Sequence, residues 1–187
     1  MLAISGSASA LCALQIDADI AVGFVDVPID ASALVDDARW LTESEKVVVY
    51  VVKLLGRGNR VMLHTARGPT DARIAELVDF LVAKGKFREQ ARNSGGRLLG
   101  FWLGLIVQKI VRSVPLKRLL LSGGDTLSQI TQVLAPDALE IEARLARGAS
   151  LCRVISQQPH LAKLQIALKG GQMGGADYFV KARQGSN

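Results

Sequence analysis

Short apolar runs alternate with longer amphipathic segments through the first two-thirds of the chain. Residues 2–5 (LAIS), 60–65 (RVMLHT) and 117–122 (KRLLLS) have the length and largely apolar character of buried β-strands. Residues 23–29 (GFVDVPI) alternate between apolar and polar positions and contain a proline, which is typical of an edge strand. Strands separated by amphipathic segments predict an α/β fold, a layered sheet with helices on both faces.

The segments between these strands show helical spacing and signals for helix ends. Asp30 or Ser32 is placed to cap a helix that ends at Gly56, and Pro69 opens a segment with one clearly apolar face. Pro115 ends the most apolar segment of the chain. We therefore expect helices over residues 8–20, about 30–56, 69–85, about 98–114 and 126–134.

The last third of the chain changes character. Three strand-like runs follow one another at short spacing, ALEIEARL, SLCRVIS and LQIAL, and a closing helix is expected in residues 176–184. This pattern predicts a sheet that is largely parallel and becomes mixed toward the C-terminus. A length of 187 residues without an obvious linker predicts a single domain over residues 1–187.

Three glycine-bearing turns stand where a strand ends and a helix begins. They are SGSAS (5–9), SGGDT (122–126) and KGGQMGG (169–175). Glycines let backbone N–H groups point outward, and the start of a helix adds a positive dipole end, so such turns suit a phosphate group. The alternative is that each glycine meets only a steric need, with Asp125 or Thr126 capping the following helix.

Charge and hydropathy narrow the classes of partner. The net charge of +6 attracts polyanions, but the densest basic stretch, residues 84–97, has one Phe and no aromatic platform, so nucleic acid is an unlikely partner. We interpret this stretch as a solvated helix face and turn. The longest apolar run, residues 98–107, is too short to cross a membrane, and the N-terminus lacks a secretory signal. We expect no membrane partner and a cytoplasmic location.

Cysteine usage and common nucleotide motifs exclude several further classes. Cys12 and Cys152 are too few for a disulfide framework or a zinc cluster, and we expect both to be small core residues. SGGDT lacks the lysine of a Walker motif, and SGSASA supplies two of the three glycines of the dinucleotide fingerprint. A nicotinamide enzyme is therefore disfavoured.

Four stretches together resemble a known family. SGSASALCALQI, LLLSGGDT, LEIEARLARGASL and LQIALKGGQMGGADYFVKA match, in order and spacing, the motifs of the C-terminal nucleotide-binding domain of the four-carbon acid sugar kinases. The resemblance covers nearly the whole chain. Arg147 stands where the family usually has proline, Gly170 replaces a serine, and Met173 replaces an aromatic residue.

The resemblance implies that the chain binds ATP with Mg²⁺. It places the nucleotide on residues of the three loops, with Asp125 as the metal ligand and Lys169 as a neutraliser of phosphate charge. The implied binding residues are Ser5, Gly6, Ser7 and Ser9, then Gly123, Gly124, Asp125 and Thr126, then Lys169, Gly170, Gly171 and Gly174.

The family's N-terminal domain, which binds the sugar acid and carries an Asp-Asp-x-Thr-Gly motif, has no counterpart in this sequence. The resemblance therefore implies the ATP-binding half of a kinase that phosphorylates an acid such as erythronate or threonate. Its sugar-acid substrate would bind through the missing domain, and the chain alone would turn over little of it. The alternative is a non-catalytic interaction module or effector-like fragment with the same fold. A homo-oligomer stays open.

Overall fold

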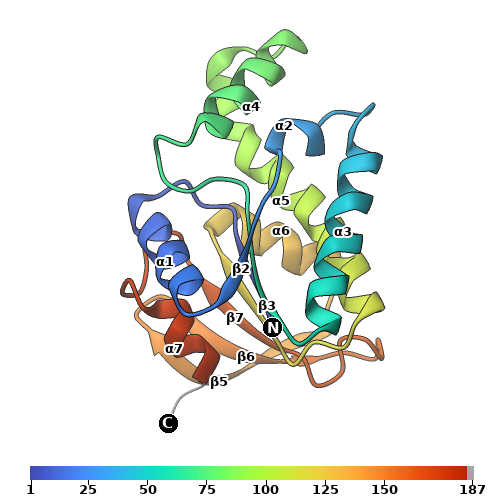
Figure 1. Ribbon diagram of the computed structural model, residues 1–187, viewed down its shortest axis with the longest axis vertical. Coiled ribbons are helices and arrows are strands. Elements are labelled where there is room, and N and C mark those ends of the chain that lie inside the picture. The colour runs from blue at the N-terminus through green and yellow to red at the C-terminus, as the bar shows by residue number, and fades with distance from the viewer. Residues whose placement is uncertain (185–187) are drawn as a thin grey trace.

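A computed structural model of the chain describes residues 1–184, which fold around one seven-stranded sheet (Figure 1). The strand order is β2-β3-β1-β4-β7-β6-β5. The first five strands in this order are parallel, and β6 and β5 are antiparallel to their neighbours. The predicted sheet, largely parallel and mixed toward the C-terminus, is confirmed. The strands are β1 (Leu2–Ser5), β2 (Phe24–Pro28), β3 (Arg60–His64), β4 (Arg118–Ser122), β5 (Ala138–Ala146), β6 (Ala149–Ile155) and β7 (Gln165–Lys169).

Helices cover both faces of the sheet, as predicted. α1 and α7 lie on one face, to the left in Figure 1, and the other helices lie on the opposite side. Alternate strand residues serve the two layers, because successive side chains point to opposite faces: Leu119 and Leu121 join the larger core, whereas Leu120 packs with Phe179 of α7. The helices are α1 (Ala10–Ala21), α2 (Ala31–Leu34), α3 (Trp40–Gly56), α4 (Ala72–Ala83), α5 (Arg88–Ser113), α6 (Gly124–Leu134) and α7 (Tyr178–Gln184).

The expected single helix over residues 30–56 is wrong, because it is divided into α2 and α3. Asp30 does cap α2, where its carboxylate accepts a hydrogen bond from the N–H of Ala33 at 2.9 Å. The division follows from Asp36, whose carboxylate accepts from the N–H of Ala38 at 3.2 Å and from Arg39 Nε at 2.7 Å. Such local side-chain bonds compete with helical ones and form a turn between the two helices.

Helix α5 begins at Arg88, ten residues before the expected start near 98. The turn expected within the basic stretch 84–97 is therefore limited to the residues before Arg88, although the stretch contains Gly95 and Gly96. Both glycines lie within the helix, where Ala91, Gly95 and Leu99 continue one buried face at intervals of four residues. The glycines therefore serve close packing and do not end the helix.

Candidate functional site

The carboxyl ends of β1, β4 and β7 lie side by side in the sheet. The register pairs Ser5 with Ser122 and Ser122 with Lys169, so the three glycine loops start from adjacent positions. The loop after β1 leads to α1 on one face, and the loop after β4 leads to α6 on the other. Ligands of open α/β sheets bind at such a switch point, beyond the carboxyl ends of the strands.

Backbone hydrogen bonds tie the three loops to one another. The N–H of Gly6 donates to the carbonyl of Ser122 at 3.1 Å, and the N–H of Gly123 donates to the carbonyl of Lys169 at 3.1 Å. The first and third loops also meet directly, since Ser9 Oγ donates to the carbonyl of Gly171 at 2.9 Å. The loops predicted from the sequence therefore form one continuous rim.

Close approach accounts for glycine at several of these positions. A Cβ on Gly6 would lie 1.9 Å from Thr126 Oγ1, and one on Gly171 would lie 2.5 Å from Ser7 Oγ. Gly123 has a φ of 112°, in the region that favours glycine. Gly124 differs, because nothing lies within 4 Å of its Cβ position. Packing within the protein therefore does not require a glycine at position 124. A ligand that lies directly against the backbone would require one.

The start of α6 is uncapped and its acidic residue is unengaged. Gly123 is the N-cap and makes no side-chain cap hydrogen bond, so the alternative in which Asp125 or Thr126 caps the helix is wrong. Asp125 is exposed and makes no hydrogen bond or ion pair with any residue in the described range 1–184. The first turn of α6 thus presents backbone N–H groups and a carboxylate to open space.

Ser9 begins α1 and also joins the loops. Its Oγ accepts a hydrogen bond from the N–H of Cys12 at 3.2 Å, which makes it the N-cap, while Ser7 Oγ lies 3.3 Å from it. Gly6, Ser7 and Ser9 are half-buried, whereas Ser5 is fully buried. The serines fix the shape of the first loop, and the hydroxyls of both Ser7 and Ser9 border Gly171 of the third loop.

Lys169 lies beneath the third loop and is fully buried. Its Nζ donates to the carbonyls of Gly170 at 3.0 Å and Gly171 at 3.2 Å, and it lies 3.6 Å from Cys12 Sγ. Burial lowers the pKa of this ammonium, and the neighbouring thiol of Cys12 opposes that effect. Its contacts show that the charge orders the loop from below, close to the predicted phosphate position.

Two residues of α1 belong to this constellation and were not predicted as site residues. Cys12 is a buried free cysteine, as expected, but its thiol also donates to the carbonyl of Gly171 at 3.0 Å and lies 3.3 Å from Ser122 Oγ. Burial by itself would raise the pKa of the Cys12 thiol. Hydrogen bonds with Ser122, Ser7 and Ser9 and the positive charge of Lys169 have the larger combined effect, so the pKa is lowered.

Gln15 holds the same third loop from α1. Its fully buried Nε2 donates to the carbonyls of Met173 at 3.1 Å and Gly175 at 2.7 Å. The sequence contains a signal for this role of Gln15, because a glutamine on the apolar face of a helix needs hydrogen-bond partners when it is buried.

Two of the departures from the family pattern, Gly170 and Met173, lie against each other in the third loop. A Cβ on Gly148, in the turn after Arg147, would lie 3.0 Å from Met173 Cγ, and one on Gly170 would lie 3.2 Å from the same atom. Met173 therefore packs the third loop against the turn between β5 and β6. Gly174, with a φ of 79°, turns the chain back toward Tyr178.

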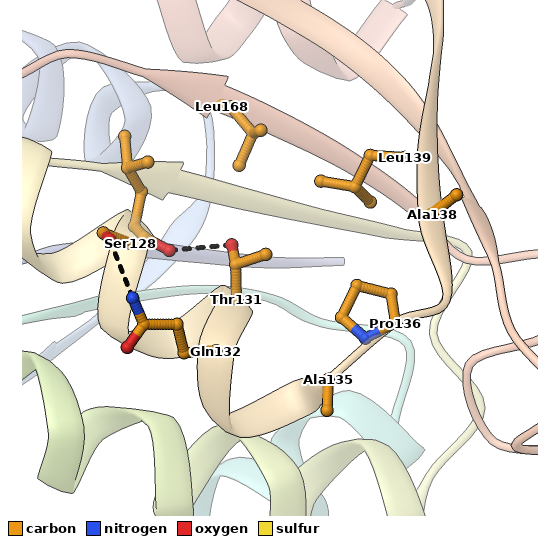
Figure 2. Close-up of a pocket in the computed structure, with 9 residues that line it drawn as sticks. Ser128, Thr131, Gln132, Ala135, Pro136, Ala138, Leu139 and Leu168 are labelled. Atoms are coloured by element: carbon orange, nitrogen blue, oxygen red, sulfur yellow. Dashed lines mark hydrogen bonds between the residues drawn. The ribbon is translucent and has the colours of Figure 1, made fainter.

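Two hollow regions flank the loops. On the β7 side, adjoining hollows of about 470 and 430 Å³ share Leu127, Leu139 and Leu168, and we call them the leucine groove. Figure 2 shows Leu139 and Leu168 facing Thr131 of α6 across it. The groove reaches Lys169 and Gly170, so it opens onto the third loop.

On the β1 side lies a cavity of about 510 Å³ between the first loop, the start of α4 and the first half of α5. We call it the arginine cavity after Arg73, Arg88 and Arg92, which line it together with Gly6 and Gly96. The loop of β4 stands between the leucine groove and this cavity, because β4 lies between β1 and β7.

Metal-binding groups are sparse. Within residues 1–184, no group of three or more His, Cys, Asp or Glu side chains gathers to hold an ion. Asp125 is a single exposed carboxylate beside the start of α6, which fits a magnesium ion that is coordinated mainly by phosphate oxygens.

None of the helices within residues 1–184 is long and apolar enough to span a membrane.

Three glycine loops meet at the switch point of one sheet that is covered by helices on both faces, which defines a three-layer α/β domain. The chain belongs to the family described as nucleotide-binding C-terminal domain, whose model matches residues 2–179. It is 37% identical over 183 residues to 3-oxo-isoapionate kinase of Paraburkholderia graminis, and 27% identical over 147 residues to D-threonate kinase of Salmonella typhimurium. These matches cover 98% and 78% of the chain and confirm the resemblance to the C-terminal domain of four-carbon acid sugar kinases.

A solved structure shares the fold. A protein of Bordetella bronchiseptica, crystallised with bound citrate as a domain-swapped dimer, superposes with a TM-score of 0.73 at 18% identity and covers 98% of this chain. The chain spans 38% and 33% of the lengths of the two kinases and 40% of that structure. The likeness in structure therefore supports the fold, and the family membership rests on the sequence matches.

Proposed function

We propose that this chain is the ATP-binding part of a kinase that phosphorylates a four-carbon sugar acid. The reaction would transfer the γ-phosphoryl group of ATP to a hydroxyl of the acid, giving ADP, a phosphate ester and a proton. The names of the relatives, kinases of 3-oxo-isoapionate and D-threonate, support this class of reaction. Family membership supports nucleotide as the donor.

The observation that carries the proposal is the open space around the Cβ position of Gly124, where packing within the protein does not require a glycine. Around it meet an uncapped helix start, the unengaged carboxylate of Asp125 and the rim formed by Gly6 and Gly171. Backbone N–H groups at a helix start bind phosphate oxygens well, because they add to the helix dipole. We assign the triphosphate to this position.

The residues divide the work of holding the phosphates. Phosphoryl transfer depends mainly on positioning and charge neutralisation. The loop N–H groups would bind phosphate oxygens, and Ser7 would add a hydroxyl. Magnesium, when bound with the nucleotide, supplies charge neutralisation, and Asp125 would hold it directly or through water. Lys169 would act through the carbonyls of Gly170 and Gly171, which it orients.

The leucine groove is the place that we assign to the nucleoside. Its leucines offer apolar walls to a purine, and Ser128, Thr131 and Gln132 of α6 lie along its other side (Figure 2). The groove adjoins Gly170, so a nucleoside there is continuous with phosphates at the loops. A partner copy stays a prediction; the Bordetella bronchiseptica structure is a domain-swapped dimer.

Replacing Gly124 by valine tests the assignment. The side chain of Gly124→Val would meet no protein atom within 4 Å of its Cβ, so the fold should persist while the phosphate position is filled. We expect ATP and ADP to raise the Tm of the original chain saturably, as a ligand that binds only the native state does. In Gly124→Val, we expect this shift to vanish.

Gly56→Val is the matched control, because Gly56 also has open space around its Cβ position but lies at the end of α3. Inorganic tripolyphosphate should bind more weakly than ATP, since it cannot use the leucine groove. Unchanged ATP binding in Gly124→Val would refute the phosphate assignment. No response of the original chain to any nucleotide would favour the non-catalytic module.

A further inference from the structure

We propose that Cys12 and Lys169 are a site of oxidative modification beneath the third loop, where hydrogen peroxide joins Cys12 Sγ to Lys169 Nζ and thereby releases the loop. We call these two side chains the clasp. The covalent step depends on the clasp alone, whereas its consequence for nucleotide binding rests on the proposed function.

The two groups of the clasp are buried next to each other. Neither Cys12 nor Lys169 has exposed surface, and Nζ lies 3.6 Å from Sγ. The aromatic rings of Tyr178 and Phe179 also lie near the amine, with centroids 5.7 and 5.8 Å from Nζ. No carboxylate among residues 1–184 lies within ion-pair distance of this amine. Of the side chains that Lys169 contacts, the thiol is therefore the one that can form a bond to it.

The carbonyl of Gly171 receives more hydrogen bonds than it needs. Ser9 Oγ at 2.9 Å, Cys12 Sγ at 3.0 Å and Lys169 Nζ at 3.2 Å all donate to it, whereas a carbonyl oxygen has two lone pairs. The thiol can therefore lose its proton without leaving this carbonyl unpaired. The charge of Lys169 and the start of α1, where Cys12 belongs to the first turn, both favour the thiolate.

A small oxidant has a short path to the sulfur. Ser9 and Gly171, which contact Cys12 from the first and third loops, are half-buried. Hydrogen peroxide is little larger than water, so it reaches the sulfur when the hydrogen bond between Ser9 and Gly171 opens locally. A nucleotide bound at the glycine loops would lie over this opening and would hinder the oxidant.

The modification consists of two steps and consumes one hydrogen peroxide. The Cys12 thiolate attacks a peroxide oxygen, the O–O bond breaks, and proton transfer leaves a sulfenic acid and water. The lone pair of the neutral Lys169 amine then attacks sulfur, the S–O bond breaks, and a second water leaves, which gives a sulfenamide. Sulfenic acids condense with nitrogen in this way. Burial lowers the pKa of Lys169, which raises the fraction of neutral amine.

The new S–N bond removes hydrogen bonds that hold the third loop. In the reduced protein, Lys169 Nζ donates to the carbonyls of Gly170 and Gly171, and the Cys12 thiol also donates to Gly171. Bond formation draws nitrogen toward sulfur and removes the ammonium charge, so these bonds are lost and Gly171 keeps the hydroxyl of Ser9. We therefore expect the loop to lose order and the affinity for nucleotide to fall.

Mass spectrometry of the 187-residue chain after peroxide treatment tests the covalent step. We expect a mass lower by two hydrogen atoms. A tryptic digest without reductant should contain peptide 1–39 joined to peptide 164–181, with Lys169 uncleaved. The cross-link should form in Cys152→Ser, be absent from Cys12→Ser, and disappear with dithiothreitol. In Lys169→Met, Cys12 should proceed to the sulfinic acid. The cross-link is detected in the original chain, so the test does not depend on the folding of a variant.

Hydrogen exchange and ATP titration before and after peroxide treatment measure the consequence for the loop. We expect faster exchange in residues 170–175 and ATP binding that is weaker by about tenfold or more, both restored by dithiothreitol. This reversal excludes oxidation of Met173 as the cause, because dithiothreitol does not reduce methionine sulfoxide. ATP present during the treatment should slow formation of the cross-link.

The outcomes separate this inference from the proposed function. A Cys12 thiol that stays free under conditions that oxidise Met173 would overturn the inference, and a sulfinic acid without a cross-link would overturn the role of Lys169. In either case, normal ATP binding would leave the nucleotide assignment standing. A cross-link without any change in loop exchange or ATP binding would overturn the proposed release of the loop. A cross-link with faster loop exchange, in a chain that binds no nucleotide even when reduced, would support the clasp and overturn the proposed function alone.

Discussion

His64 is held as a neutral imidazole at the carboxyl ends of β2 and β3. Arg73 Nη2 can only donate, and it lies 3.2 Å from Nδ1, so Nδ1 is the acceptor. Nε2–H then donates to Asp26 at 2.8 Å. Burial lowers the pKa of His64, and Asp26 only partly opposes this effect. The histidine thus supports the wall of the arginine cavity, to which Arg73 also belongs.

This arrangement predicts a pH dependence of stability. Since the folded-state pKa of His64 is depressed, the unfolded chain takes up the proton more readily, and the free energy of unfolding should fall as pH drops from 7.5 to 5.5. In His64→Gln, which does not titrate, that decline should become shallower in urea unfolding at several pH values. His160→Gln is the control, and an unchanged slope in His64→Gln would contradict the interpretation.

At the scale of elements, glycines on α5 bring this helix close to α6. A Cβ on Gly100 would lie 3.0 Å from Gln129 Cβ and 3.1 Å from the carbonyl of Asp125, and one on Gly104 would lie 2.8 Å from Val133 Cγ2. Contacts this short leave no room for a methyl group. The position of α6, and of the loop at its start, therefore depends on the absence of side chains at these two glycines of α5.

Replacing Gly104 by alanine should destabilise the protein. Overpacking typically costs about 1–3 kcal/mol, which exceeds the gain of up to about 1 kcal/mol in helix propensity. Gly56→Ala, in open space at the end of α3, should be neutral or stabilising. Chemical unfolding of both variants measures the difference. Equal stability of the two would mean that the two helices separate without cost.

For the whole molecule, the relation to longer relatives sets the expected activity. The chain corresponds to about two-fifths of their length. The proposed nucleotide site lies within this chain, whereas the resemblance assigns the sugar acid to the family's N-terminal domain. We therefore expect the chain alone to bind ATP and to phosphorylate little or no sugar acid.

An assay of ADP release with D-threonate or erythronate measures this directly. The expected result is a rate with acid no higher than the slow background rate without it. Addition of a separate sugar-acid-binding domain from a relative is the informative control, because any gain in rate would show that this chain supplies a competent donor site. Steady phosphorylation by the chain alone would contradict the prediction.

Much of the fold follows from local patterns. Each of the seven strands within residues 1–184 lies in a segment that was predicted as a strand, from a short apolar run or, for β2, from alternating apolar and polar positions. The three glycine loops were identified by their place between a strand and a helix. The predicted ends of helices were wrong in two places. At Asp36, side-chain hydrogen bonds to the backbone interrupt the helical pattern, and in α5 glycines allow close packing where they were expected to end a helix.

The sequence by itself determined which loops have bare backbone and which residues they carry. Only the tertiary structure decided that β1, β4 and β7 are neighbours, because strand order depends on how helices pack on the two faces. It also decided that Lys169 lies beneath its loop with Cys12 and that Gln15 holds the same loop. These facts depend on contacts between residues far apart in the chain, which no local pattern encodes.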